Sequence, residues 1–150
     1  MVETFPMVPA TGRAYAVFIP VALVGLLVLA LAVYLAWSPG HVQFEVSPGT
    51  LRIRGDLYGR TIPLSELQLA EARIIDLRQE PDLRPRFRKN GTGLPGYSAG
   101  WFRLAGGAKA LLFLTERSQV AVIPDKQGWL LLLSVADGRR FLDALRNAAR

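Results

Sequence analysis

The segment WFRLAGGAKALLFLT, residues 101–115, holds two short apolar runs with Gly106-Gly107 between them. A Gly-Gly pair favours the tight turn of a β-hairpin, because the central residues of that turn need positive φ angles. The spacing therefore predicts one strand over 101–104 and a second over 108–115. A chain organised around such a hairpin is built from β-structure.

The same short period recurs on both sides of this hairpin. Apolar and polar residues alternate in HVQFEV (His41–Val46), and the turn residues Ser47-Pro48-Gly49 precede a return run through Leu51 and Ile53. The segment LAEARIIDL fits a strand or a helix, and we predict a strand. The further predicted strands are 59–63, 69–77, 119–124 and 129–133, with turns at 64–67 and 125–128. Eight strands about ten residues apart are typical of an antiparallel sandwich or barrel.

The period changes in the last seventeen residues, 134–150. Apolar side chains recur there at spacings of three and four, which predicts one amphipathic helix. Ser134 and Asp137 have the S-x-x-D spacing of a capping box. The predicted fold is mainly β: an antiparallel β-barrel or sandwich of seven or eight strands, capped by one C-terminal α-helix.

The N-terminal part contains an apolar stretch, residues 14–37, with no charged side chain in 24 residues. As a helix it would be about 36 Å long, enough to cross a hydrocarbon core of about 30 Å. We therefore predict an N-terminal flank (1–13), a single transmembrane helix (14–37) and a domain (38–150). A cleaved signal peptide is the alternative, with Ala30-Leu31-Ala32 as its cleavage site, but the apolar stretch continues past that site to Trp37.

The side of the membrane on which the domain lies is left open by the sequence. Lys and Arg near the ends of a helix set its orientation. Only Arg13 lies close upstream, and Arg52 and Arg54 are the first basic residues downstream. The expected location is a bacterial inner membrane, crossed once.

Charge and composition restrict the kinds of partner and chemistry. The chain carries 18 Lys and Arg against 12 Asp and Glu, a net charge of +6, which favours anionic surfaces. It has no cysteine and a single histidine, His41, so it lacks the usual ligands of a zinc site. No G-x-S-x-G or G-x-x-x-x-G-K-[ST] motif occurs. We expect no enzyme activity, no cofactor, no metal and no small-molecule substrate.

A predicted loop over 78–99 contains the candidate binding residues. Its first part, Arg84–Lys89 (RPRFRK), has four cations and one aromatic ring, and near a membrane each cation would gain about 1 kcal/mol from anionic lipid. The alternative interpretation of this basic segment is a solvated loop without a binding role. Nucleic acid is disfavoured as a partner because the predicted membrane helix tethers the domain. Its second part, Asn90–Tyr97 (NGTGLPGY), has three glycines, typical of a turn or of close backbone approach. The second part also includes a glycosylation sequon, Asn90-Gly91-Thr92. The candidate binding residues are Arg84, Arg86, Phe87, Arg88, Lys89, Asn90, Gly91, Thr92, Gly93 and Tyr97.

Several segments together resemble the bacterial pleckstrin-homology-like (PH) domain proteins that carry an N-terminal membrane helix. They are GRTIPLSEL (59–67), NGTGLPGY (90–97), GWFRL (100–104), KALLFLT (109–115) and LLLS (131–134). The resemblance covers roughly 41–145 and implies a PH-like barrel with a helical cap and a binding or scaffolding role. The first hairpin loop, Ser47–Thr50, departs from phosphoinositide-binding PH domains because it has no basic residue.

The functional hypothesis is a membrane-anchored binding or scaffolding module. Its loops would recognise a partner protein or an anionic membrane surface, and the lipid bilayer is its expected partner. The alternative is a small structural subunit of a membrane protein complex, assembled through the apolar helix, for which Gly25 offers a small packing residue. Substitution of the basic residues of the predicted loop would separate these two hypotheses.

Overall fold

The computed structural model describes residues 15–37 and 42–150, and the predicted flank 1–13, Ala14 and His41 lie outside these residues. The chain divides into two units after Trp37. The first unit contributes one helix. The second contains all the described strands and the C-terminal helix, and each unit is treated by itself.

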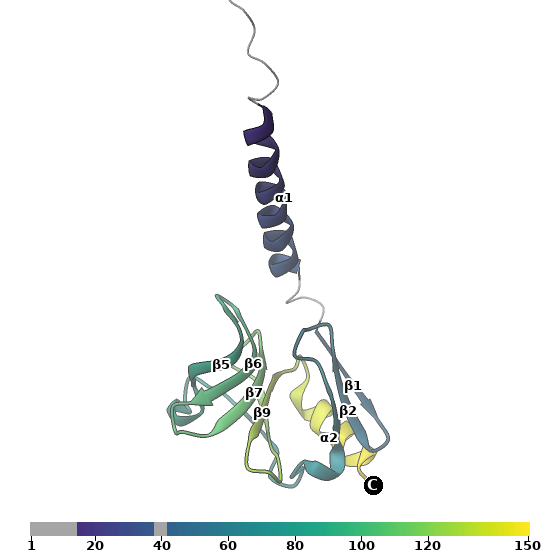
Figure 1. Ribbon diagram of the computed structural model, residues 1–150. Coiled ribbons are helices and arrows are strands. Elements are labelled where there is room, and N and C mark those ends of the chain that lie inside the picture. The colour runs from purple at the N-terminus through teal and green to yellow at the C-terminus, as the bar shows by residue number, and fades with distance from the viewer. Residues whose placement is uncertain (1–14, 38–41) are drawn as a thin grey trace, which may run out of the picture. The chain divides into compact units, whose positions relative to one another are not determined.

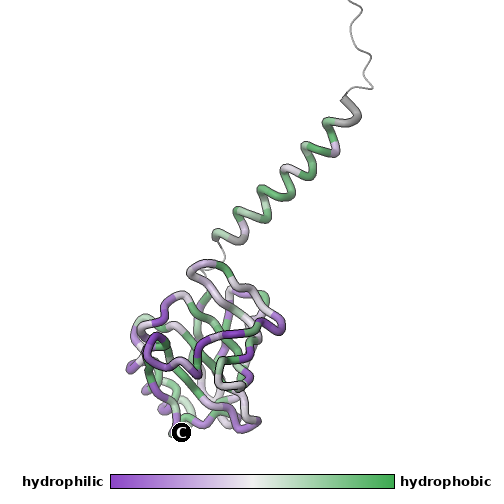
Figure 2. Tube along the Cα trace, turned by 90° about the vertical axis from the view of Figure 1, so that its left-hand side faces the viewer, coloured by the Kyte–Doolittle hydropathy of each residue, from purple (hydrophilic) through white to green (hydrophobic). Residues whose placement is uncertain are grey.

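The helix α1 (Tyr15–Trp37) forms over the apolar stretch predicted to be helical. It has 23 residues, with Pro20 near its start and no acidic or basic residue in its first and last turns. The large apolar side chains described between Phe18 and Tyr34 are exposed, from 45% for Tyr34 to 70% for Leu27. Figure 2 shows hydrophobic colour along nearly all of this helix. By length and hydropathy, no helix within the described ranges is identified as a membrane span.

The second unit is mainly β, as predicted, and its strands form two sheets followed by one helix, α2 (Gly138–Ala148) (Figure 1). The smaller sheet is an antiparallel hairpin with a third short strand beside it, in the order β1-β2-β3. The larger sheet has the order β4-β8-β9-β7-β6-β5. The strands are β1 (Gln43–Ser47), β2 (Thr50–Arg54), β3 (Thr61–Pro63), β4 (Arg73–Ile75), β5 (Pro85–Leu94), β6 (Tyr97–Leu104), β7 (Lys109–Leu114), β8 (Val120–Pro124) and β9 (Leu130–Ser134).

The larger sheet is not wholly antiparallel, which corrects the prediction. Strand β9 lies between β7 and β8, so that it pairs antiparallel with β8 and parallel with β7. A parallel pair needs a connection longer than a tight turn, and β8 with its flanking loops provides it here. The local hairpin pattern of the sequence could not reveal this insertion.

Both faces of the central strands of the larger sheet are buried. Leu111, Phe113 and Leu131 belong to a cluster shared with the smaller sheet and α2, whereas Leu112 and Leu132 belong to a second cluster on the opposite face. Leu77 and Leu83, from the connection between β4 and β5, also belong to that second cluster. The central strands are therefore continuous apolar runs, as in sheets covered on both sides.

The predicted loop over 78–99 is wrong for most of its length. Residues 85–94 form β5, and β6 begins at Tyr97, leaving only Pro95 and Gly96 as the turn between them. Two irregularities in the pairing, at Arg86 and at Lys89, interrupt the alternation of β5. Bulges insert one extra residue and remove the period of two, and this is why the segment looked irregular in the sequence.

The predicted capping box is also wrong. Ser134 is the last residue of β9, and its hydroxyl donates to the Glu116 carbonyl oxygen at 2.6 Å. The helix α2 begins at Gly138 rather than Ser134, and Asp137 is its N-cap, accepting a hydrogen bond from the Arg140 N–H at 3.0 Å. Of the strand predicted over 69–77, only β4 forms.

Candidate functional site

Two aromatic residues and three cations come together on β5, β6 and β7, at one edge of the larger sheet. The register places Phe87 opposite Arg103, and Arg103 opposite Lys109, in one row across the three strands. The next row on the same face, two residues along β6, holds Asn90 and Trp101. Residues directly opposite each other in antiparallel strands point to the same face of the sheet. These side chains therefore share one face.

Trp101 is the centre of this face. The Lys109 Nζ lies 4.2 Å and the Arg60 Cζ 5.1 Å from the centroid of its ring. Trp129 packs edge-on against the same indole, with the ring centroids 5.2 Å apart. The Arg86 guanidinium lies over Phe87, 5.3 Å from that ring centroid. We call the set Arg60, Arg86, Phe87, Trp101, Arg103 and Lys109 the basic aromatic face.

The cations of this face form no ion pair with an acidic side chain among the described residues. The ion pairs in the described part of the chain are Arg54–Glu45, Arg78–Asp76 and Arg146–Asp143, all outside the face. Arg103 and Lys109 lie directly opposite each other, an arrangement that is destabilising for like charges. Indole rings compensate such charge only in part, by roughly 0.5–1 kcal/mol at exposed sites. The face is therefore suited to an anionic ligand.

The loop between β2 and β3 carries Arg60 to Trp101. The Asp56 carboxylate accepts from the Tyr58 N–H at 2.8 Å through Oδ1, and Tyr97 donates its hydroxyl to Oδ2 of the same residue. Further along, the Tyr58 hydroxyl donates to Asn90 Oδ1 at 3.3 Å. At Gly59 a Cβ atom would lie 2.6 Å from the Ile53 carbonyl oxygen, so glycine is required there. These contacts fix the loop against β5 and β6.

The predicted basic segment does not act as one group. Arg84 donates its Nε to the Leu77 carbonyl oxygen at 3.1 Å and a terminal nitrogen to the Arg78 carbonyl oxygen, so it holds the chain before β5. Arg88 lies opposite Phe102, which belongs to the second core cluster, on the other face of the sheet. Lys89 is an extra residue in the pairing. Only Arg86 and Phe87 contribute to the basic aromatic face.

The glycine-rich part of the candidate site forms a strand and a two-residue turn rather than a loop. Gly91 lies opposite Gly100, and a Cβ atom on Gly91 would be 2.4 Å from the Ala99 carbonyl oxygen. Close backbone approach, one of the two expected reasons for glycine, is therefore confirmed at Gly91. Thr92 and Gly93 follow in β5, and Asn90 and Tyr97 make the hydrogen bonds to the β2–β3 loop given above.

Sequence reasoning missed Arg60, Trp101, Arg103 and Lys109. The signal for three of them was present in the hairpin over 101–115. Trp101 and Arg103 are two residues apart on one strand, and Lys109 lies across the turn, so all three point to the same face. Arg60 could not be found in this way, because its approach to Trp101 depends on contact between the two sheets.

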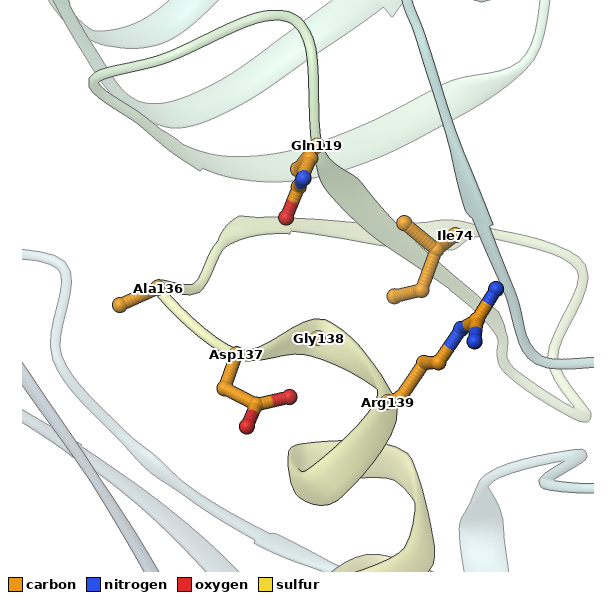
Figure 3. A pocket seen from close by; sticks show the side chains of 6 residues that line it. All are labelled: Ile74, Gln119, Ala136, Asp137, Gly138 and Arg139. Atoms are coloured by element: carbon orange, nitrogen blue, oxygen red, sulfur yellow. The ribbon is translucent and has the colours of Figure 1, made fainter.

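A hollow in the domain lies elsewhere, at the start of α2. It has a volume of about 480 Å³ and is lined by Ile74, Gln119, Ala136, Asp137, Gly138 and Arg139 (Figure 3). The Asp137 carboxylate is already used as the helix cap. Across the described residues, no group of three or more His, Cys, Asp or Glu side chains is placed to hold a metal ion. The cavity thus offers no set of convergent catalytic groups.

The two sheets and the terminal helix define a β-sandwich of the PH-like kind. Residues 42–149 match the family model described as "Bacterial PH domain". The match covers most of the chain, so the chain belongs to the bacterial PH domain family. No curated protein and no solved structure matches it.

Proposed function

We propose that this protein is a non-catalytic binding module, anchored in a bacterial inner membrane by α1, whose basic aromatic face contacts anionic lipid headgroups. The observation that carries the proposal is Trp101, flanked by Arg60 and Lys109 without a carboxylate partner in the described part of the chain. Membership of the PH family supports binding rather than catalysis. Both parts of the proposal are open to separate tests.

The composition of α1 supports the anchor, although no described helix is identified as a span. At about 1.5 Å per residue, its 23 residues would extend about 34 Å, more than a hydrocarbon core of about 30 Å. Thirteen of these residues are Val, Leu, Ile or Phe, each gaining roughly 0.3–0.6 kcal/mol at the centre of a bilayer. Hydrophobic transfer adds over side chains, so an isolated α1 is unfavourable in water and favourable in lipid.

The size of the expected lipid attraction follows from the four cations of the face. Each gains about 1 kcal/mol beside an anionic surface, or about 4 kcal/mol together. With 1.4 kcal/mol per tenfold change in affinity, this corresponds to roughly several hundredfold tighter binding to anionic than to neutral lipid. Because the Debye length is about 8 Å at physiological salt, the preference must weaken as salt is raised.

The face is tested with a fragment of residues 42–150 and vesicles of phosphatidylcholine, with and without phosphatidylglycerol. The variant Arg60→Gln, Arg103→Gln, Lys109→Gln removes three charges from the face. The matched control, Arg139→Gln, Arg140→Gln, Arg150→Gln, removes three exposed charges outside it. We expect roughly a hundredfold weaker binding to anionic vesicles for the first variant and a small change for the control. Equal losses of binding for the two variants would mean that the net charge of the domain determines binding, and not this face.

The anchor is tested by washing membranes that contain the full chain with alkaline carbonate. Retention in the pellet supports α1 as an integral anchor, and release contradicts it. The alternative is a structural subunit assembled through α1. It is favoured if the full chain is retained in the pellet while the variant of the basic aromatic face binds anionic vesicles as well as the unchanged fragment.

A further inference from the structure

We propose that Leu57, together with Leu94, inserts into the interfacial layer of the bilayer that holds α1, so that one end of the domain is its lipid-facing end. This inference rests on the proposed anchoring and adds an orientation to it. The partner is the lipid surface itself.

Leu57 is the most exposed large apolar side chain in the domain, with 77% of its surface accessible, and it lies in the loop between β2 and β3. Leu94, at the end of β5, is 37% accessible. Tyr97, just after the β5–β6 turn, donates its hydroxyl to the Asp56 carboxylate, next to Leu57. The two loops are thus joined, and their apolar residues belong to the same end of the domain.

The β2–β3 loop is held in the conformation that exposes Leu57. Asp56 accepts from the Tyr58 N–H at 2.8 Å and its carbonyl oxygen accepts from the Gly59 N–H at 3.1 Å, which closes the turn on both sides of Leu57. The Ile53 N–H donates to the Arg60 carbonyl oxygen at 2.8 Å and closes the base. A loop fixed in this way cannot fold Leu57 back onto the domain. Transfer of this leucine from water into the apolar part of a bilayer is favourable.

The chain enters the domain at this same end. Gln43, the first residue of β1, pairs with Arg54, which directly precedes the β2–β3 loop. Val42 and Tyr97 line one small cavity of about 70 Å³. From Trp37 to Gln43 the chain has six Cα steps, which at full extension reach at most about 20 Å. With α1 in a bilayer, covalent reach alone keeps this end near the lipid surface.

The charges near the loop agree with a lipid surface. From Leu57 the loop continues through Tyr58 to Arg60, which lies over Trp101 at the start of the basic aromatic face. An apolar tip followed by cations and an indole matches the order of layers in a membrane interface, where apolar groups enter and cations and Trp remain at the headgroups. The tip is therefore adjacent to the Arg60–Trp101 end of the basic aromatic face, and Arg103 and Lys109 lie further along β6 and β7, beside the β6–β7 turn.

The natural absence of cysteine allows single fluorescent labels on the full chain. Leu57→Cys and Leu94→Cys report on the tip, and Ser47→Cys reports on the turn at the other end of β1. Gly25→Cys reports on the anchor, where an added side chain meets nothing within 4 Å. Each labelled protein is placed in vesicles of phosphatidylcholine and phosphatidylglycerol that contain lipids with a quencher close to the headgroup.

We expect blue-shifted emission and quenching at positions 57 and 94, unshifted and unquenched emission at 47, and blue-shifted emission at 25. If 57 and 94 behave like 47 while 25 is in lipid, the inference is wrong and the anchor stands. If 25 also remains in water, the anchor itself is wrong. The near-UV circular dichroism spectrum of each labelled protein must match that of the unlabelled chain, which shows that the fold is retained. A Leu57→Ile variant with the label at position 94 should keep the blue-shifted emission at that position. Loss of that shift would also contradict insertion.

Discussion

The pair Gly91 and Gly100 allows β5 to approach β6, and Gly100→Ala is the sharpest test of this geometry. Gly100 has φ of +104°, and a Cβ atom on it would lie 2.5 Å from the Gly91 Cα and 2.6 Å from the Asn90 carbonyl oxygen. Both contacts are with backbone, so a side chain cannot rotate away to relieve them. The strand β5 must move instead.

The expected cost has two parts. A positive φ costs a residue with a side chain roughly 1–2 kcal/mol. Displacing β5 also weakens one or two hydrogen bonds of the β5–β6 ladder, at about 1 kcal/mol each. Together they lower the free energy of unfolding by about 3 kcal/mol. For a domain of this size that corresponds to a fall in Tm on the order of 15 °C.

The assay is thermal unfolding of the full chain in detergent micelles, followed by the near-UV circular dichroism of the tryptophans. Gly93→Ala is the matched control, because Gly93 lies on the paired strand β5, is absent from the positive-φ glycines and has nothing within 4 Å of an added Cβ. The control should be unchanged or more stable by up to about 1 kcal/mol. If Gly100→Ala and Gly93→Ala unfold at the same temperature, the close approach of the two strands is not what the glycines provide.

Three further results are expected. Asp137→Ala removes the cap of α2 and should lower the free energy of unfolding by about 1 kcal/mol, measured from the urea midpoint, whereas Asp143→Ala on the exposed face should not. Hydrogen bonds from the backbone N–H groups of Arg117 and Ser118 lower the pKa of Glu116. The stability that the Glu116 carboxylate contributes is therefore complete above its ordinary pKa of 4.5 and is lost as the pH falls below that value. Glu116→Gln should flatten the dependence of the free energy of unfolding on pH in this acidic range. Arg86→Gln should weaken binding to anionic vesicles, while Lys89→Gln, outside the face, should leave it nearly unchanged.

The sequence predicted eight of the nine described strands and the terminal helix, because most strands are marked by glycine turns and by short apolar runs. It failed at β5, where the two extra residues remove the alternation that identifies a strand. It also failed at the start of α2. Ser134 and Asp137 fit a capping box by spacing, but Ser134 is engaged by the 115–116 backbone, with hydrogen bonds at 3.1 Å from the Thr115 and Glu116 N–H groups. Local spacing cannot report a bond to a distant segment.

The candidate site was predicted in part, and the reason is again the extra residues of β5. With regular alternation Arg84, Arg86 and Arg88 would share one face, whereas the irregular pairing places Phe87 and Asn90 beside Arg103 and Trp101 and turns Arg88 toward Phe102.

These irregularities also fit the position of β5 at the edge of the larger sheet. Bulges and exposed cations on an edge strand oppose pairing with a second chain. The cations of β5 that lie outside the basic aromatic face therefore have a physical role of their own, and a run of positive charge in sequence need not be a single binding site. The site was instead assembled across strands, where register brings Arg103 and Lys109 together and the β2–β3 loop adds Arg60. Binding and edge protection are then separable by mutation, even though their residues are adjacent in the chain.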